Sequence, residues 1–131
     1  MLCAFSFGVE AANPSTTADA YGNWQSPAEN HYWRVVDPDP QGLNCRMRGT
    51  IGDILTIRER GLPLTIGEFW TQTTLPEGYV FKGGRYSFNT ANTTFDALIY
   101  DDRGLPWVYN TDDKCFVRAN SAFIVPAGNR R

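Results

Sequence analysis

The chain has 131 residues, of which 42% are hydrophobic and 20% are charged, and its formal net charge is −2. This length and composition predict one globular domain and exclude a fibrous or disordered chain. The chain contains no block of Lys or Arg, which argues against nucleic-acid binding, and its longest apolar run is too short to span a membrane.

The start of the chain divides into two expected segments. Residues 1–12 hold a short apolar run that ends in small residues typical of a signal-peptidase site, although a basic n-region is missing. This segment is therefore either the remnant of a signal peptide or a strand that packs on the domain. Residues 13–31 are rich in Asn, Pro, Ser, Thr, Ala and Gly and predict an irregular leader. Within it, Tyr21 and Trp24 could fix the leader to the domain or present it to a partner.

From Tyr32 onward, short apolar stretches alternate with turn residues at intervals of about eight to twelve residues, which is typical of all-β barrels and sandwiches. No stretch keeps a helical period, so we expect no helix apart from a single 3₁₀ turn at residues 121–123. Gly83 and Gly84 predict a tight hairpin between residues 79–81 and 85–88. The other expected strands cover residues 33–37, 43–47, 53–58, 95–100, 106–109 and 115–117, with a further apolar segment at 64–70.

The chain has three cysteines, and removal of residues 1–12 would leave the pair Cys45 and Cys115. Each of the two stands in a segment that alternates apolar and polar residues, so neighbouring strands could bring the two sulfurs together. In an exported domain the pair would form a disulfide that closes a loop of roughly 70 residues and stabilises the fold by about 4 kcal/mol. The alternative is a pair of buried thiols.

Three short segments resemble bacterial SH3-like (SH3b) domains. Residues 42–46 (Gly-Leu-Asn-Cys-Arg) are similar to the family's Leu-Asn-x-Arg opening strand, and residues 115–121 (Cys-Phe-Val-Arg-Ala-Asn-Ser) are similar to its closing strand. Residues 104–107 (Gly-Leu-Pro-Trp) look like its Gly-x-Pro-Trp strand start. The variant with a cysteine in both end segments resembles exported proteins of oxygenic photosynthetic bacteria.

The resemblance implies an all-β fold, a small SH3-like barrel over residues 32–127, followed by a tail at 128–131. The chain departs from the family pattern after the opening strand, where Met-Arg-Gly-Thr at 47–50 replaces the usual Gly-Pro segment. It also carries an enlarged central insertion between Arg58 and Thr94, so the resemblance does not locate a ligand groove.

Groups suited to catalysis or metal binding are sparse. His31 is the one histidine, and the loop that begins at Asp37 has Arg48 where a calcium loop requires a bidentate Glu. We therefore expect no metal, no cofactor and no enzyme. Paired carboxylates for glycoside hydrolysis remain conceivable, but Asp is favoured in turns for backbone reasons. The acidic residues concerned stand in predicted hairpin turns: Asp101, Asp102, Asp112 and Asp113.

Eighteen residues are Phe, Tyr or Trp, more than one small barrel can bury. We expect Trp107, Phe116 and Phe123 in the core. Amphipathic aromatic side chains are typical of surfaces that bind proteins or sugars. The candidate binding residues are Trp24, Trp33, Trp70, Tyr79, Tyr86 and Tyr109.

Together these features predict a non-catalytic binding module outside the cytoplasm, in a periplasm or thylakoid lumen. The preferred hypothesis is a small accessory subunit that docks on a larger protein assembly, such as a lumenal photosynthetic complex, through its leader and insertion. The alternative is a cell-wall module that binds peptidoglycan peptides or glycans, as many SH3b domains do. An aromatic groove with polar edges would favour the cell-wall module, and a flat apolar patch would favour docking.

Overall fold

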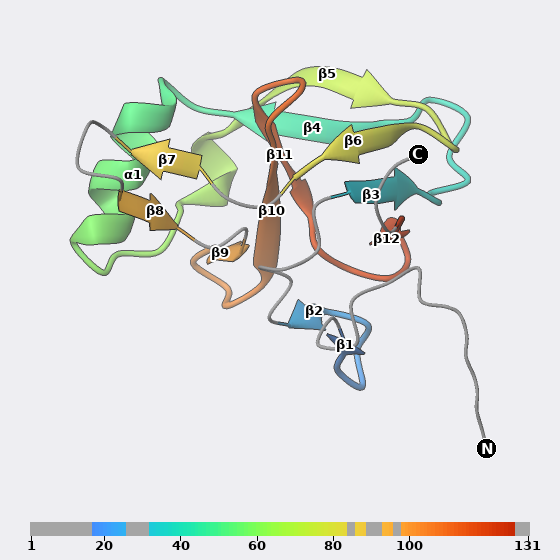
Figure 1. Cartoon of the computed structure of the whole chain (residues 1–131), viewed down its shortest axis with the longest axis horizontal. Coiled ribbons are helices and arrows are strands. Elements are labelled where there is room, and N and C mark those ends of the chain that lie inside the picture. The colour runs from blue at the N-terminus through green and yellow to red at the C-terminus, as the bar shows by residue number, and fades with distance from the viewer. Residues whose placement is uncertain (1–16, 26–31, 84–85, 89–92, 96–97, 128–131) are drawn as a thin grey trace.

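The computed structural model describes residues 17–25, 32–83, 86–88, 93–95 and 98–127 (Figure 1). The expected signal remnant at 1–12 and the tail at 128–131 lie outside the described residues. The strands are β1 (Thr17–Ala18), β2 (Trp24–Gln25), β3 (Tyr32–Val35), β4 (Leu43–Met47), β5 (Trp70–Leu75), β6 (Val80–Lys82), β7 (Tyr86–Phe88), β8 (Thr93–Phe95), β9 (Leu98–Tyr100), β10 (Pro106–Asn110), β11 (Cys115–Arg118) and β12 (Ile124–Pro126). The helices are α1 (Ile51–Glu59) and the short 3₁₀ helix η2 (Ile66–Glu68).

The fold is all-β, as expected, with antiparallel pairing between its strands. A five-stranded sheet has the order β5-β4-β11-β10-β9, and a three-stranded sheet has the order β12-β3-β6. The pairs β1-β2 and β7-β8 form two further small sheets. Among the described residues, no strand pairing joins the two larger sheets into a closed barrel.

Part of the hydrophobic core lies between the two larger sheets. Trp33 on β3 stands opposite Phe81 on β6, and both side chains are fully buried. Gly83 follows β6, and a Cβ at this position would lie 3.0 Å from the Trp33 ring and 3.2 Å from the side chain of Val108 on β10. The small sheet therefore packs closely against the face of the five-stranded sheet that carries Val108.

The Cys45–Cys115 disulfide predicted as one of two alternatives is present. It joins the neighbouring strands β4 and β11, with the two Cα atoms 5.3 Å apart, a separation typical of a disulfide. Both cysteines are fully buried, and the side-chain amide of Asn110 lies 3.9 Å from the Cys45 sulfur. The covalent link therefore lies inside the core and holds together the middle of the five-stranded sheet.

The prediction of a strand at residues 53–58 is wrong, because this segment belongs to helix α1. Ile51, Ile54 and Ile57 recur every three residues, so they share one helical face; Ile54 is fully buried, and the other two pack against the core. The helix begins with a reciprocal cap: Thr50 Oγ1 accepts a hydrogen bond from the Asp53 N–H, and Asp53 Oδ2 accepts one from the Thr50 N–H. The apolar segment 64–70 likewise contains η2 instead of a continuous strand.

The prediction of a hairpin around Gly83 and Gly84 is also wrong. Strand β6 pairs with β3, and β7 pairs with β8. Pairing with β3 places Phe81 beside Trp33 in the core, where both side chains are fully buried and contribute to stability. The chain after β6 is also held by the β10–β11 turn, since the Thr111 N–H donates to the Lys82 carbonyl at 2.8 Å.

Part of the predicted leader, residues 17–25, forms the β1–β2 hairpin and packs on the C-terminal strands (Figure 1). The backbone N–H of Trp24 donates to the Ala119 carbonyl at 2.8 Å, and its indole Nε1 donates to the Ile124 carbonyl at 2.9 Å. The Trp24 ring meets the Trp33 ring edge-on, with centroids 5.7 Å apart. Trp24 therefore fixes this hairpin to the core, whereas Tyr21 is 85% exposed. No helix in the described part of the chain is long and apolar enough to cross a membrane.

Candidate functional site

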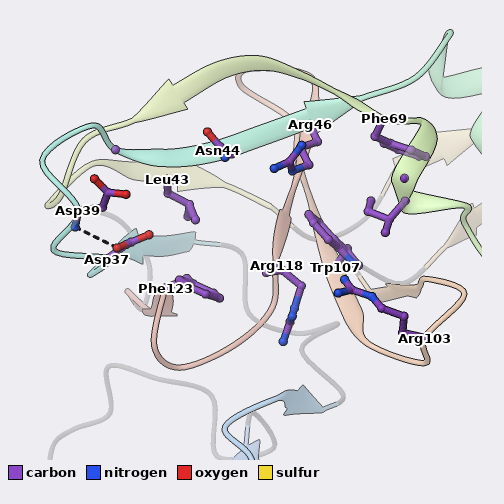
Figure 2. A pocket seen from close by; sticks show the side chains of 13 residues that line it. Asp37, Asp39, Leu43, Asn44, Arg46, Phe69, Arg103, Trp107, Arg118 and Phe123 are labelled. Atoms are coloured by element: carbon purple, nitrogen blue, oxygen red, sulfur yellow. Dashed lines mark hydrogen bonds between the residues drawn. The ribbon is translucent and has the colours of Figure 1, made fainter.

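An open groove with a volume of about 500 Å³ lies across strands β4, β10 and β11 (Figure 2). Its apolar lining comes from Leu43 on β4, Ile66 and Phe69 in and after η2, Trp107 on β10 and Phe123 in the turn before β12. These residues come from four separate parts of the chain, so the groove exists only once the five-stranded sheet has formed.

The sheet register explains why charged side chains reach the groove. Arg118 stands directly opposite Trp107, and Arg46 stands directly opposite Phe116. Phe116 and Arg118 are two residues apart on β11, so they point to the same face of the sheet. Arg46, Trp107 and Arg118 therefore share one face, while Cys115 points to the other.

Three arginines gather around Trp107 at one end of the groove (Figure 2). Arg103 is paired with Asp101 at 2.8 Å, and Arg118 Nη2 donates to Asn23 Oδ1 at 2.8 Å. The Nε of Arg118 is buried and has no hydrogen-bond partner, and Arg46 makes no side-chain hydrogen bond or ion pair with the described residues. Burial lowers the pKa of Arg118, the nearby Arg103 charge adds to this effect, and Asp101 opposes it.

Asp101 holds the arginine end in place. It is 2% exposed and accepts hydrogen bonds from the backbone N–H groups of Arg103 at 2.8 Å and Leu105 at 3.0 Å, and from Trp107 Nε1 at 2.8 Å. Burial acts to raise the pKa of this carboxyl, but the hydrogen bonds from Trp107, Arg103 and Leu105 outweigh it, so the pKa lies below its ordinary value. Asp101 therefore stays ionised and fixes the orientation of the Trp107 indole.

The opposite end of the groove is acidic, with Asp37 and Asp39 in the loop between β3 and β4 (Figure 2). Asp37 Oδ1 accepts from the Asp39 N–H at 3.0 Å, and Asp39 Oδ1 accepts from the Gln41 N–H at 2.9 Å. These bonds stabilise the loop as successive Asx turns. The described residues contain no cluster of three or more His, Cys, Asp or Glu side chains that could hold a metal ion.

The predicted binding aromatics lie elsewhere. Trp33 and Tyr109 are only 0% and 3% exposed. They belong to the core, and the prediction that they form a binding surface is wrong. Trp24 and Tyr79 are half-buried, and Trp70 is 52% exposed at the start of β5. Tyr86 lies in β7, and its side chain is not among those that the structure describes. None of the other five side chains lines the groove.

Two groove residues, Trp107 and Phe123, were predicted for the core, and both are in part core residues. The arginines were missed as site residues, although the sequence carries a signal for them. Arg46 follows Cys45 by one residue and Arg118 follows Cys115 by three, so strand alternation places both arginines on the face opposite the disulfide.

The turn carboxylates considered as catalytic candidates make structural hydrogen bonds. Asp113 Oδ2 accepts from the Tyr79 hydroxyl at 2.7 Å and from the Asn110 side-chain amide at 2.8 Å. Asp112 Oδ2 accepts from the Lys82 N–H at 2.8 Å, while Asp102 is exposed. The hydrogen bond to Asp113, together with burial and the two carboxylate charges, raises the pKa of Tyr79 to about 12.

We expect Tyr79→Phe to lower the free energy of unfolding by about 1 kcal/mol, the usual net contribution of one hydrogen bond. The raised pKa means that the unfolded chain ionises first, so the stabilisation is complete below the ordinary tyrosine pKa of about 10. It declines as the pH rises through the folded-state value of about 12. Urea unfolding across this range measures the effect, with Tyr100→Phe at an exposed site as the control. Equal stability of the two variants would contradict the role of the hydrogen bond.

Comparisons with protein-family models, with curated proteins and with solved structures found no match. The functional assignment of the groove therefore depends on its own residues.

Proposed function

We propose that this protein is a non-catalytic binding module that takes an extended peptide segment in the groove between the 37–42 loop and η2. The supporting observation is an aromatic and aliphatic floor with charged groups at both ends. Binding sites for organic ligands combine these features: an apolar surface supplies burial, and a few polar groups supply orientation. A groove open to solvent, formed on a sheet held by a disulfide, is suited to a chain-like ligand.

Of the two functional hypotheses, the groove favours the cell-wall module. Peptides attached to a wall polymer present short segments with amide, amine and carboxylate groups, and each of these has a complementary group in the groove. The partly exposed ring of Phe123 offers an aromatic surface for the aliphatic parts of such a ligand, whereas Trp107 and Phe69 are only 4% and 7% exposed and contribute the edges of buried rings. The SH3b resemblance of the two cysteine-containing segments supports the same assignment.

A location outside the cytoplasm belongs to the same proposal. A disulfide between buried cysteines is typical of proteins that mature in oxidising compartments such as the periplasm or a thylakoid lumen. Of these two compartments, the periplasm is the one that contains cell-wall peptides.

Docking on a protein assembly is the second candidate. Its support is the exposure of Tyr21 on the β1–β2 hairpin and of Trp70 at the start of β5. β5 is an edge strand of the five-stranded sheet, and its sequence Trp-Thr-Gln-Thr-Thr-Leu has no charged residue to prevent pairing with a partner strand.

Cosedimentation with purified cell-wall sacculi tests the proposed function. Gly67 lines the groove, and a Cβ at this position would meet nothing within 4 Å, so we expect Gly67→Trp to leave the core undisturbed and to obstruct the groove. We expect the unaltered chain to sediment with sacculi and Gly67→Trp to lose at least about tenfold in affinity, as for the loss of a central contact. Gly52→Trp on α1, outside the groove, is the matched control.

Equal sedimentation of both variants would contradict the groove as the binding site. Absence of sedimentation, together with migration as part of a large complex on native gels, would replace the cell-wall module by the docking subunit.

A further inference from the structure

The groove is electrically polarised, and its two ends have opposite charge. Arg46, Arg103 and Arg118 line one end, and Asp37 and Asp39 line the other (Figure 2). The formal net charge of the chain is −2, so the positive end is a local feature that contrasts with the whole protein.

Two of the three arginines have unused hydrogen-bonding capacity. Asp101 compensates the charge of Arg103 at 2.8 Å. Arg118 uses Nη2 to bind Asn23, and its guanidinium lies 6.0 Å from the centroid of the Phe123 ring. Its Nε is buried and has no hydrogen-bond partner among the described residues, which costs free energy. Arg46 is half-buried and makes no side-chain hydrogen bond or ion pair among the described residues.

The carboxylates at the acidic end of the groove also have hydrogen-bond acceptor oxygens that the described residues do not use. Asp37 and Asp39 each engage Oδ1 in a turn, and their Oδ2 atoms accept no hydrogen bond from the described residues. An amine or amide N–H of a ligand could bind there, with the apolar floor of Leu43 and Phe123 between this end and the arginines.

We propose that the groove binds a zwitterionic short peptide in one orientation, with its free carboxylate on Arg46 and Arg118 and its amino group at Asp37 and Asp39. This inference rests on the proposed peptide-binding function and specifies its ligand class. A planar guanidinium matches a carboxylate and donates two parallel hydrogen bonds, which a lysine cannot reproduce. The opposite charges at the two ends would disfavour the reversed peptide, since reversal places like charges together.

The experiment compares three forms of trialanine, with both termini free, with an amidated C-terminus and with an acetylated N-terminus. Binding is followed by NMR of the isotope-labelled chain, in which the Trp107 Nε1–H and the Arg118 Nε–H report on the arginine end. We expect amidation to weaken binding about tenfold or more, because it removes charge-assisted hydrogen bonds. Acetylation should weaken binding as well. Compared with the free peptide, the acetylated peptide should differ mainly in the chemical-shift changes that it causes in the 37–42 loop.

Variants that each remove one charge test which end of the groove binds the carboxylate and which end binds the amino group of the peptide. Arg46→Gln should bring the affinity ratio between the free and the amidated peptide close to one, whereas Arg34→Gln, at an exposed position outside the groove, should leave it unchanged. Asp39→Asn should in the same way remove the preference for a free amino group, with Asp102→Asn as its control.

Two negative outcomes have different meanings. If all three peptides bind equally and shift the groove resonances, the proposed peptide-binding function stands and the charge-directed orientation is overturned. If none of them shifts these resonances at millimolar concentration, both are overturned.

Discussion

Loss of the Cys45–Cys115 disulfide is expected to lower the free energy of unfolding by about 4 kcal/mol. The bridge spans a sequence separation of 70 residues, so its removal releases a large loop in the unfolded chain. For a domain of this size, the loss corresponds to a fall in melting temperature of about 10 °C or more. Thermal unfolding of the Cys45→Ala, Cys115→Ala double variant measures it without relying on access of a reductant to the buried bridge.

Cys3→Ala provides the control for cysteine removal, since this position takes no part in the bridge. The reduced parent chain should melt close to the double variant. A melting temperature equal to that of the oxidised chain would show that the bridge contributes nothing to stability.

Asp101→Ala is expected to lower the free energy of unfolding by about 3 kcal/mol, because its removal leaves buried donors without an acceptor. The indole N–H of Trp107 loses the carboxylate oxygen that it binds, and two backbone N–H groups of the β9–β10 turn lose their acceptor as well. Since Trp107 lines the groove, we expect this variant to lose peptide binding as well as stability.

The pH dependence of stability gives a second test of Asp101. The pKa of this carboxyl is lower in the folded chain than in the unfolded chain, so its contribution is complete above the ordinary Asp pKa of about 3.9. It is lost as the pH falls through the lower folded-state value. Asp101→Asn should therefore show a shallower fall in stability on acidification than the parent chain, while exposed Asp102→Asn should follow the parent. Identical acid unfolding of all three chains would contradict this role.

The features of the fold that the sequence predicted are those set by local pattern. The β10–β11 hairpin follows from two apolar segments around an acidic turn. The pairing of β4 with β11 is long-range, and it was expected only because each strand carries one cysteine. Helix α1 was missed because Leu55 and Ile57 are two residues apart, as in a strand, while Ile54 and Ile57 are three apart, as in a helix, and so short a segment does not separate the two patterns. The Thr50–Asp53 capping pair distinguishes the two, and it is readable in the sequence.

The site was harder to predict, for two physical reasons. Every residue of β10 is buried, so alternation there does not separate core from surface, and Tyr109 was assigned to the wrong class. The groove is also assembled by long-range pairing: Arg46 and Arg118 become neighbours of Trp107 only through the strand order β4-β11-β10. Neither residue stands in a local motif that indicates binding, so only their odd offsets from the cysteines, of one and three residues, placed them on the same face.

The contact of the β1–β2 hairpin with the last strands has a consequence for biosynthesis. Trp24 bonds to the Ile124 carbonyl, 100 residues further along the chain, and Cys45 has its partner 70 residues away. A nascent chain therefore cannot complete either contact until nearly all of the described residues have left the ribosome or the export channel. During that interval Cys45 is a free thiol beside an unpaired strand edge, a state prone to mispairing. Oxidation of Cys45 therefore begins only after the segment that carries Cys115 has been synthesised and can reach it.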